Sequence, residues 1–246
     1  MALVYLSPST QEFNPYITGG NEEQYMNLIA NAMEPYFRAS GISFVRNRRD
    51  MTAAQIIQAS NEGQYDLHLA LHSNAAPESL SGTLQGSDVY YDPRSPRGQR
   101  AAELIAAGLR EIYPHPELVS ALPTTTIGEV VKVRAPAVLI EFAYHDNPED
   151  AAWIQNNIAA IARSVSQSVT RYFGLPFLEP QPPRKGRVDV AWGSLNIRER
   201  PSTSSAILAR AYDGASLTIW NQYQGWYVVS FGNVFGYANG AYVIPE

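Results

Sequence analysis

Two apolar runs in the middle of this 246-residue chain end on side chains that can do chemistry. The run 67–71 closes on His72, and the run 136–140 closes on Glu141. Imidazole and carboxylate groups bind metal ions and transfer protons. Short apolar runs are typical of buried strands, so both groups are predicted at the carboxyl edge of a sheet, where α/β proteins form their active sites.

The residue types present restrict the metal chemistry. The chain has no cysteine, so metal ligands must come from His, Asp, Glu and amide oxygens. A catalytic zinc site takes three protein ligands and leaves one position open. His72 is one candidate ligand, although a hydrogen-bonded core histidine would give the same pattern. Glu22 and Glu23 follow a Gly-Gly-Asn turn, where carboxylates also favour a helix N-terminus.

The elements that must position these groups alternate between strand and helix patterns, which predicts an α/β fold with a mostly parallel, twisted sheet flanked by helices. Thr52, Ser95 and Asn147 stand where helix N-caps are expected. The predicted strands are Leu3–Leu6, Ser43–Arg46, Asp66–Leu71, Asp88–Tyr91 and Ala137–Glu141. The predicted helices are Glu22–Ser40, Thr52–Asn61, Pro96–Ile112 and Pro148–Phe173.

A proline-rich stretch divides the chain. Residues 176–186 are predicted to be an extended, semi-rigid linker between a domain of residues 1–175 and a domain of residues 187–246. Beyond the linker, turn signals recur about every ten residues, which predicts a small all-β barrel. Its predicted strands are Ala206–Ala211, Ser216–Asn221, Trp226–Phe231 and Phe235–Asn239.

Charge and hydropathy exclude several partners. The net charge of −5 gives no indication of a positively charged surface that would bind nucleic acid. No apolar stretch approaches the roughly 20 residues of a membrane span. The chain opens directly on a strand pattern with no visible signal peptide, so we expect either a cytoplasmic protein before release or a trimmed secreted form.

Three segments carry a resemblance to a known family. Asn21-Glu22-Glu23-Gln24-Tyr25, Leu71-His72-Ser73-Asn74-Ala75 and Pro136-Ala137-Val138-Leu139-Ile140-Glu141 resemble zinc-dependent N-acetylmuramoyl-L-alanine amidases of the amidase-3 type. The three segments occur in the same order as in that family, and the similarity covers roughly residues 1–175. The resemblance implies a zinc amidase fold and a Zn²⁺ cofactor.

The resemblance assigns roles to three residues. It implies that Glu22 and His72 are zinc ligands and that Glu141 is the general base. Glu22 is preferred to Glu23 because the family's glutamate ligand commonly follows an asparagine, as Glu22 follows Asn21. A shift of one residue would reverse that choice.

The chain departs from the family at the first metal ligand. Where the family usually has an Asp-Pro-Gly-His turn, this chain has Ser7–Glu12, and no histidine precedes His68. Gln11 is therefore predicted to be the third ligand, although an amide oxygen is a poorer donor to zinc than imidazole. Thr10, Glu12 and a bridging water are the alternatives, and a degenerate metal site is a further one.

Other polar residues near the expected sheet edge are predicted to contact substrate: Asn74, Thr125, Glu129 and His145. Ordinary loop hydrogen bonds, or the start of a helix in the case of His145, would explain them as well. His68 is expected on the same strand face as His72, beneath it, where it would either support that ligand or simply pack, and packing is preferred. His115 is expected to be a surface loop residue without a role.

The C-terminal segment resembles bacterial SH3 domains through Leu195-Asn196-Ile197-Arg198 and Gly225-Trp226-Tyr227-Val228-Val229. In that family such modules often tether hydrolases to peptidoglycan. Trp220, Tyr223 and Trp226 are predicted to bind the cell wall. Trp192, Tyr227 and Tyr237 are further candidates, but most aromatic residues of so small a barrel belong to its core.

Together these features predict a peptidoglycan amidase that cleaves the amide bond between N-acetylmuramic acid and L-alanine by zinc-activated water. It is expected to act at the bacterial cell wall. The sequence does not specify the oligomeric state, although a monomer is favoured. The alternatives are a wall-binding protein with impaired catalysis and a zinc carboxypeptidase acting on another peptide. The preferred stem peptide is not specified by the sequence.

Overall fold

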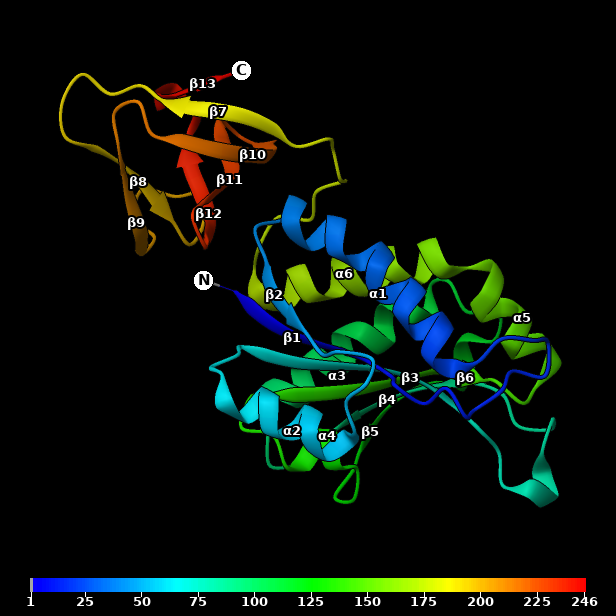
Figure 1. Ribbon diagram of the computed structural model, residues 1–246. Coiled ribbons are helices and arrows are strands. Elements are labelled where there is room, and N and C mark those ends of the chain that lie inside the picture. Colours follow the sequence, from blue (N-terminus) through cyan, green and yellow to red (C-terminus); the bar gives the residue numbers. More distant parts are fainter. Residues whose placement is uncertain (1) are drawn as a thin grey trace. The chain divides into compact units, whose positions relative to one another are not determined.

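The computed structural model describes residues 2–246, which form two compact units (Figure 1). One unit consists of residues 3–33 and 44–172. The other consists of residue 2, residues 34–43 and residues 173–246. The first helix, α1, begins in the former and ends in the latter. The predicted domain limits at 175 and 187 stay a prediction.

The first unit contains a six-stranded sheet of order β2-β1-β3-β6-β4-β5. Strands β1, β3 and β6 are parallel to one another, β4 is antiparallel to β6, and β5 is parallel to β4. The mostly parallel sheet is therefore confirmed. Its strands are β1 (Leu3–Pro8), β2 (Ser43–Arg46), β3 (Leu67–Asn74), β4 (Ser87–Tyr91), β5 (Val119–Pro123) and β6 (Ala137–Tyr144).

Helices cover both faces of this sheet. Figure 1 shows α2 and α4 on one face and α1, α5 and α6 on the other. Helix α3 packs against α6, where Ser168 donates a hydrogen bond to the Leu104 carbonyl. The helices are α1 (Glu22–Ala39), α2 (Ala53–Glu62), α3 (Pro96–Arg110), α4 (Gly128–Val131), α5 (Pro148–Asn156) and α6 (Ile158–Phe173), with short 3₁₀ turns at Glu78–Leu80 and Pro116–Leu118.

The three predicted N-caps are confirmed. Thr52 accepts from the backbone N–H of Gln55, Ser95 from that of Gly98, and Asn147 from those of Glu149 and Asp150. Each side chain satisfies donors that the first helical turn leaves without intrahelical partners.

Two of the differences between the sequence expectations and the structure concern a helix and a strand around the six-stranded sheet. The single helix predicted over 148–173 is interrupted at Asn157, whose side-chain amide donates to the Trp153 carbonyl and so competes with the helical ladder. Strand β5 was not predicted. It is a short edge strand that ends on a proline, and only Val119 in it is buried, so it lacks a strong apolar pattern.

The C-terminal part of the second unit is an antiparallel sheet of order β13-β7-β10-β11-β12-β8-β9, which confirms the predicted all-β region. Its core contains Val188, Leu195, Ile197, Ile219 and Val229. The strands are β7 (Arg184–Val188), β8 (Ser194–Arg198), β9 (Ile207–Tyr212), β10 (Ser216–Tyr223), β11 (Trp226–Phe231), β12 (Val234–Asn239) and β13 (Val243–Pro245), with a 3₁₀ turn at Gly240–Tyr242.

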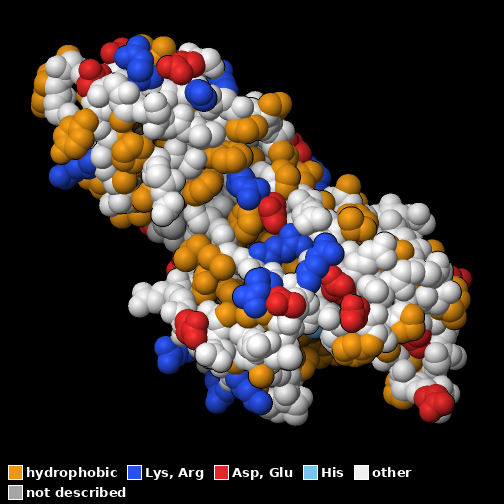
Figure 2. All heavy atoms as spheres, in the orientation of Figure 1, with side chains coloured by type: hydrophobic (Ala, Val, Ile, Leu, Met, Phe, Trp, Pro, Cys, Tyr) orange, Lys and Arg blue, Asp and Glu red, His pale blue; other side chains and the backbone are white. Residues whose placement is uncertain are grey.

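Strand β7 begins inside the segment that the sequence predicts to be linker, because residues 184–186 pair with β10. Among residues 2–246, no helix combines the length and the apolar character needed to cross a membrane. On the face drawn in Figure 2, acidic and basic side chains are interspersed.

Candidate active site

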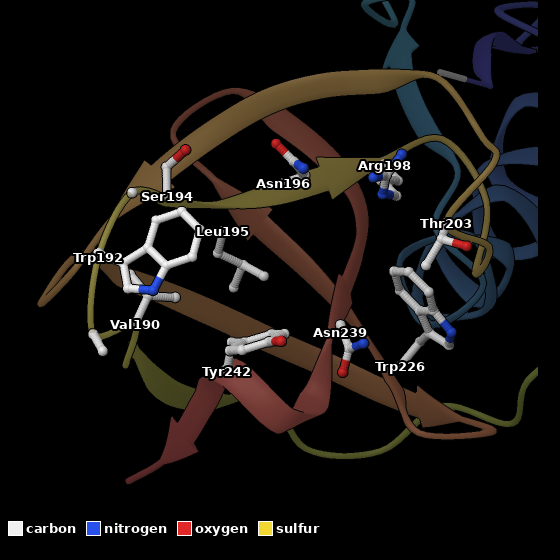
Figure 3. Close-up of a pocket in the computed structure, with 12 residues that line it drawn as sticks. Val190, Trp192, Ser194, Leu195, Asn196, Arg198, Thr203, Trp226, Asn239 and Tyr242 are labelled. Carbon is white, nitrogen blue, oxygen red and sulfur yellow. The ribbon is translucent and has the colours of Figure 1, made fainter.

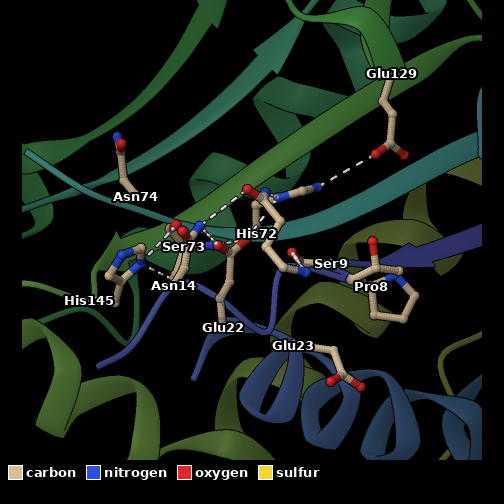
Figure 4. Close-up of polar contacts among 12 residues, drawn as sticks. Pro8, Ser9, Asn14, Glu22, Glu23, His72, Ser73, Asn74, Glu129 and His145 are labelled. Carbon is tan, nitrogen blue, oxygen red and sulfur yellow. Dashed lines mark hydrogen bonds and ion pairs between the residues drawn. The ribbon is translucent and has the colours of Figure 1, made fainter. Parts of the chain in front are cut away.

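Three of the predicted site residues, Glu22, His72 and Glu141, lie at the carboxyl edge of the sheet, and Figure 4 shows the first two of them. His72 lies near the end of β3 and is directly in register with Glu141 on the adjacent strand β6. Parallel neighbours in register point to the same face, so the two side chains lie side by side. Glu22 is the first residue of α1, which begins after a turn with Gly19 and Gly20 at positive φ.

Glu22 and His72 are in direct contact. Glu22 Oε1 lies 2.9 Å from His72 Nδ1, and both residues are buried. Burial alone would lower the pKa of His72, but the carboxylates of Glu129 and Glu22 outweigh it and hold that pKa well above its usual value. Burial would raise the pKa of Glu22, but His72, Asn14 and Ser9 together lower it.

Gln11 lies beside this pair, with its amide nitrogen 3.3 Å from His72 Nδ1. Asn14 holds the arrangement by donating to Gln11 Oε1 at 3.2 Å and to Glu22 Oε2 at 2.6 Å. The structure thus places Gln11 on the Nδ1 side of His72, with the amide nitrogen facing the ring. The amide must turn over to offer its oxygen. Thr10 bonds instead to the Met51 carbonyl at 2.9 Å.

Glu141 carries a buried carboxylate oxygen, Oε2, that has no hydrogen-bond partner within the described part of the chain. Burial raises the pKa of Glu141 to about 8, His72 lowers it, and the nearby carboxyl groups of Glu22 and Asp88 raise it further. A carboxyl group with a pKa close to neutrality is suited to accept and release a proton.

The electrostatics and the donor chemistry of this cluster fit a cation. Glu22 and Glu129, whose pKa values are lowered, lie on either side of the His72 ring, so two ionised carboxylates are buried beside this imidazole. Zinc takes His nitrogen and carboxylate oxygen at about 2.0–2.2 Å, which places tetrahedral donors about 3.3–3.6 Å apart. Glu22 Oε1 and His72 Nδ1, which are 2.9 Å apart, need to separate by only about half an ångström to share such an ion. Across residues 2–246, no group of three or more His, Cys, Asp or Glu side chains is arranged to hold a metal ion.

Glu129 lies on the other side of the His72 ring from Glu22 (Figure 4). Its Oε1 is 3.6 Å from His72 Nε2, and its Oε2 accepts hydrogen bonds from Ser7 Oγ at 2.7 Å and from His68 Nε2 at 3.0 Å. Burial would raise the pKa of Glu129, but His68 and His72 lower it well below its usual value. His68, for which packing was the preferred expectation, is a hydrogen-bond donor to Glu129. The cluster of Ser7, His68 and Glu129 was not predicted from the sequence. The only pattern that pointed to it was the expected position of His68 on the same strand face as His72.

A cavity of about 840 Å³ opens beside His72 and Glu129. Its other walls come from the loop after β1 and from residues 49–56, and they include Gln11, Phe13 and Arg49. Of the four predicted substrate residues, only Glu129 lines this cavity.

The remaining three predicted substrate residues have other surroundings. The Asn74 side chain accepts from the backbone N–H of Ala75, and Thr125 is exposed on a loop. His145 is buried, with its Nδ1 3.0 Å from Ser73 Oγ and its ring stacked on Tyr16. The roles of these three residues in substrate binding stay predictions.

The all-β region has a groove of its own, of about 370 Å³ (Figure 3). Of the three residues predicted to bind the cell wall, only Trp226 lines it. Trp220 donates to Ser230 Oγ and packs on Phe235, and Tyr223 lies outside the groove. Trp192, which is 89% exposed, and Tyr242 form the other aromatic walls. Tyr237 is fully buried.

Comparisons with known proteins agree with the two regions. The family described as N-acetylmuramoyl-L-alanine amidase, of the amidase-3 type, matches residues 12–171, and the bacterial SH3 domain matches residues 193–244. The amidase match begins after Thr10 and Gln11, where the usual first histidine is missing. No curated protein sequence matches this chain.

Solved structures share the fold of the first region at low sequence identity. The amidase AmiC2 of Nostoc punctiforme superposes with a TM-score of 0.61 at 15% identity, covering 70% of this chain and 97% of that one. The catalytic domain of CwlV from Bacillus (Paenibacillus) polymyxa gives 0.61 at 16% identity, covering 72% and 100%. The catalytic domain of the CD27L endolysin, which targets Clostridia difficile, gives 0.58 at 21%, covering 70% and 98%.

Proposed function

Because this chain belongs to the N-acetylmuramoyl-L-alanine amidase family, we propose that it is a zinc-dependent peptidoglycan amidase acting at the bacterial cell wall. The bond cleaved is the amide between N-acetylmuramic acid and the L-alanine of the stem peptide. The observation that carries the proposal is the meeting of Glu22, His72 and Glu141, with a 2.9 Å contact between the first two and strand register joining the last two.

Glu22 and His72 are the residues that would hold zinc, with Gln11 as the third donor once its amide has turned over. When bound, zinc supplies Lewis-acid activation of water and of the scissile carbonyl. A positive charge beside Glu141 also favours the ionised carboxylate, which burial otherwise disfavours.

Glu141 carries the proton transfers. Its carboxylate accepts a proton from the attacking water while the new carbon–oxygen bond forms at the amide carbon. The protonated carboxyl group then gives this proton to the alanine nitrogen as the carbon–nitrogen bond breaks, so Glu141 returns to its starting state. The walls of the cavity beside His72 position the substrate.

The groove of the all-β region supports a second part of the proposal, namely that this region tethers the enzyme to peptidoglycan. Exposed aromatic side chains with a polar rim are suited to stacking on sugars or on peptide. Trp192, Trp226 and Tyr242 supply the aromatic surface, and Asn196 and Arg198 lie along its β8 side (Figure 3). Tethering raises the local concentration of substrate at the active site.

The test combines metal content with product identity. The full chain, purified without chelator and reloaded with zinc, is expected to hold close to one zinc per chain, and His72→Ala is expected to lose it. Digestion of purified peptidoglycan is expected to release new amino termini on L-alanine. Tight wall binding without zinc or cleavage would leave only a wall-binding protein, and new carboxyl termini without new alanine amines would indicate a carboxypeptidase.

A further inference from the structure

The two ring nitrogens of His72 have different surroundings. Nδ1 faces Glu22 and Gln11, on the side where the cation is proposed to bind. Nε2 is buried and has no hydrogen-bond partner among the described residues, and it lies 3.6 Å from Glu129 Oε1. The ring is therefore placed between two carboxylates, one on each side (Figure 4).

The two oxygens of Glu129 are also used differently. Oε2 accepts from Ser7 Oγ and from His68 Nε2. His68 is held in turn by Ser60 Oγ, 2.9 Å from its Nδ1. Since Oε2 takes both of these bonds, Oε1 is left to face His72. Glu129 is thus fixed by β1, β3 and α2, although its own helix, α4, has only four residues.

A metal ion at Nδ1 determines where the imidazole hydrogen must be. Neutral imidazole carries one N–H, so a ring that gives its Nδ1 lone pair to a cation carries the hydrogen on Nε2. Histidine ligands in metal sites nearly always donate this second N–H to a carboxylate, a carbonyl or water. Glu129 is the carboxylate in that position, and a separation of 3.6 Å needs only a small movement to become a hydrogen bond.

We propose that Glu129 is a positioning residue that orients His72 and fixes its tautomer, so that Nδ1 is presented to the cation. The inference rests on the proposed function, because it concerns the same cation. It replaces the predicted substrate contact of Glu129 with a role that acts through His72. Ser7 and His68 contribute by holding the Glu129 carboxylate.

The burial of Glu129 supports this role over a simple packing role. The residue is 7% exposed, and a carboxylate is costly to bury unless it is paired. His68 and Ser7 alone would satisfy one oxygen, whereas the second oxygen points at the only ring nitrogen of His72 that the proposed cation leaves free.

The test is the zinc affinity of the full chain carrying Glu129→Gln, measured by competition with a chromophoric chelator. The variant keeps the size of the side chain but weakens the acceptor at His72 Nε2, so zinc binding is expected to fall by about 10- to 100-fold. Glu103→Gln, the same change on the exposed side of α3, is the matched control and is expected to leave affinity unchanged.

His68→Gln supplies a second, independent variant. Because His68 acts on zinc only through Glu129, its effect is expected to be smaller, and the double variant is expected to bind zinc no more weakly than Glu129→Gln alone. If Glu129→Gln does not fold, an unchanged zinc affinity in folded His68→Gln overturns the proposal. A folded Glu129→Gln variant with wild-type affinity overturns it directly. Failure of the unaltered chain to bind zinc counts against the proposed function instead.

Discussion

The cavity at the sheet edge and the groove of the all-β region are built from different kinds of side chain. Near the cavity, the polar side chains are buried or partly buried and hydrogen-bond to one another, as Asn14, Glu22 and His72 do. In the groove, the notable side chains are exposed aromatic rings such as that of Trp192. Mutual hydrogen bonds hold polar atoms in fixed positions, whereas exposed rings offer apolar area to a ligand. This difference supports the proposal that one region carries out the chemistry and the other attaches the protein to its substrate.

The substitution with the largest expected effect on this division of roles is Glu141→Gln. The amide cannot accept the proton of the attacking water, so turnover on purified peptidoglycan is expected to fall by about 10²- to 10⁴-fold. Zinc content and binding to insoluble wall are expected to stay at wild-type levels. Retention of amide cleavage in this variant would remove Glu141 from the mechanism.

A second substitution tests which residue is the third zinc donor in the proposed metal site. Gln11→Ala is expected to weaken zinc binding by about tenfold or more, because it removes a donor next to Glu22 and His72. Thr10→Ala is the matched control, since Thr10 bonds to the Met51 carbonyl, and it is expected to change affinity little. Chelator competition measures both variants. The reverse ranking would make Thr10 the third donor.

Glu141 also predicts a pH dependence of stability in the metal-free protein. Its pKa of about 8 in the folded chain exceeds the unfolded value near 4.5, so the folded state binds the proton more tightly. Stability is therefore lost as the pH rises from about 4.5 to about 8. Glu141→Gln removes this loss and is expected to raise the free energy of unfolding by about 1–2 kcal/mol at pH 8, with little difference near pH 4.5.

Denaturant unfolding at both pH values, in the presence of chelator, measures this difference. Glu103→Gln, the same substitution on an exposed helix surface, is expected to change stability little at either pH. An equal gain for Glu141→Gln at both pH values would contradict the assigned cause.

The substitution with the smallest expected effect tests whether the groove of the all-β region binds peptidoglycan. Trp192→Ala is expected to weaken binding of the full chain to insoluble peptidoglycan by about three- to tenfold, because it removes an exposed stacking surface. Turnover on small soluble muropeptides is expected to be unaffected. Tyr212→Ala, at another exposed aromatic residue outside the groove, is the control in a sedimentation assay. Equal losses in both variants would mean that the groove is not the binding surface.

Sequence patterns predicted what depends on local periodicity. His72 and Glu141 could be placed at one sheet edge because each ends an apolar run, and the register confirms that they are neighbours. Asn147 could be identified as a cap from its own helix start. These features are determined within a few residues of chain.

Features that depend on tertiary packing could not be predicted in this way. Glu129 follows an irregular loop, and its contacts with Ser7 and His68 join segments 122 and 61 residues apart. Trp220 and Trp192 are chemically identical, yet one is tied to Ser230 and the other is exposed. No periodic pattern distinguishes them, because the difference is set by which strands lie next to them.

The pairing of β3 with β6 has a consequence for how this site can change. Backbone hydrogen bonds of the sheet hold His72 opposite Glu141, so their spacing does not depend on any connecting loop. Gln11, by contrast, sits in the irregular segment after β1. Substitutions can therefore accumulate around residue 11 while the proposed proton-transfer group stays in place, which makes that segment the natural starting point for directed evolution of the proposed metal preference.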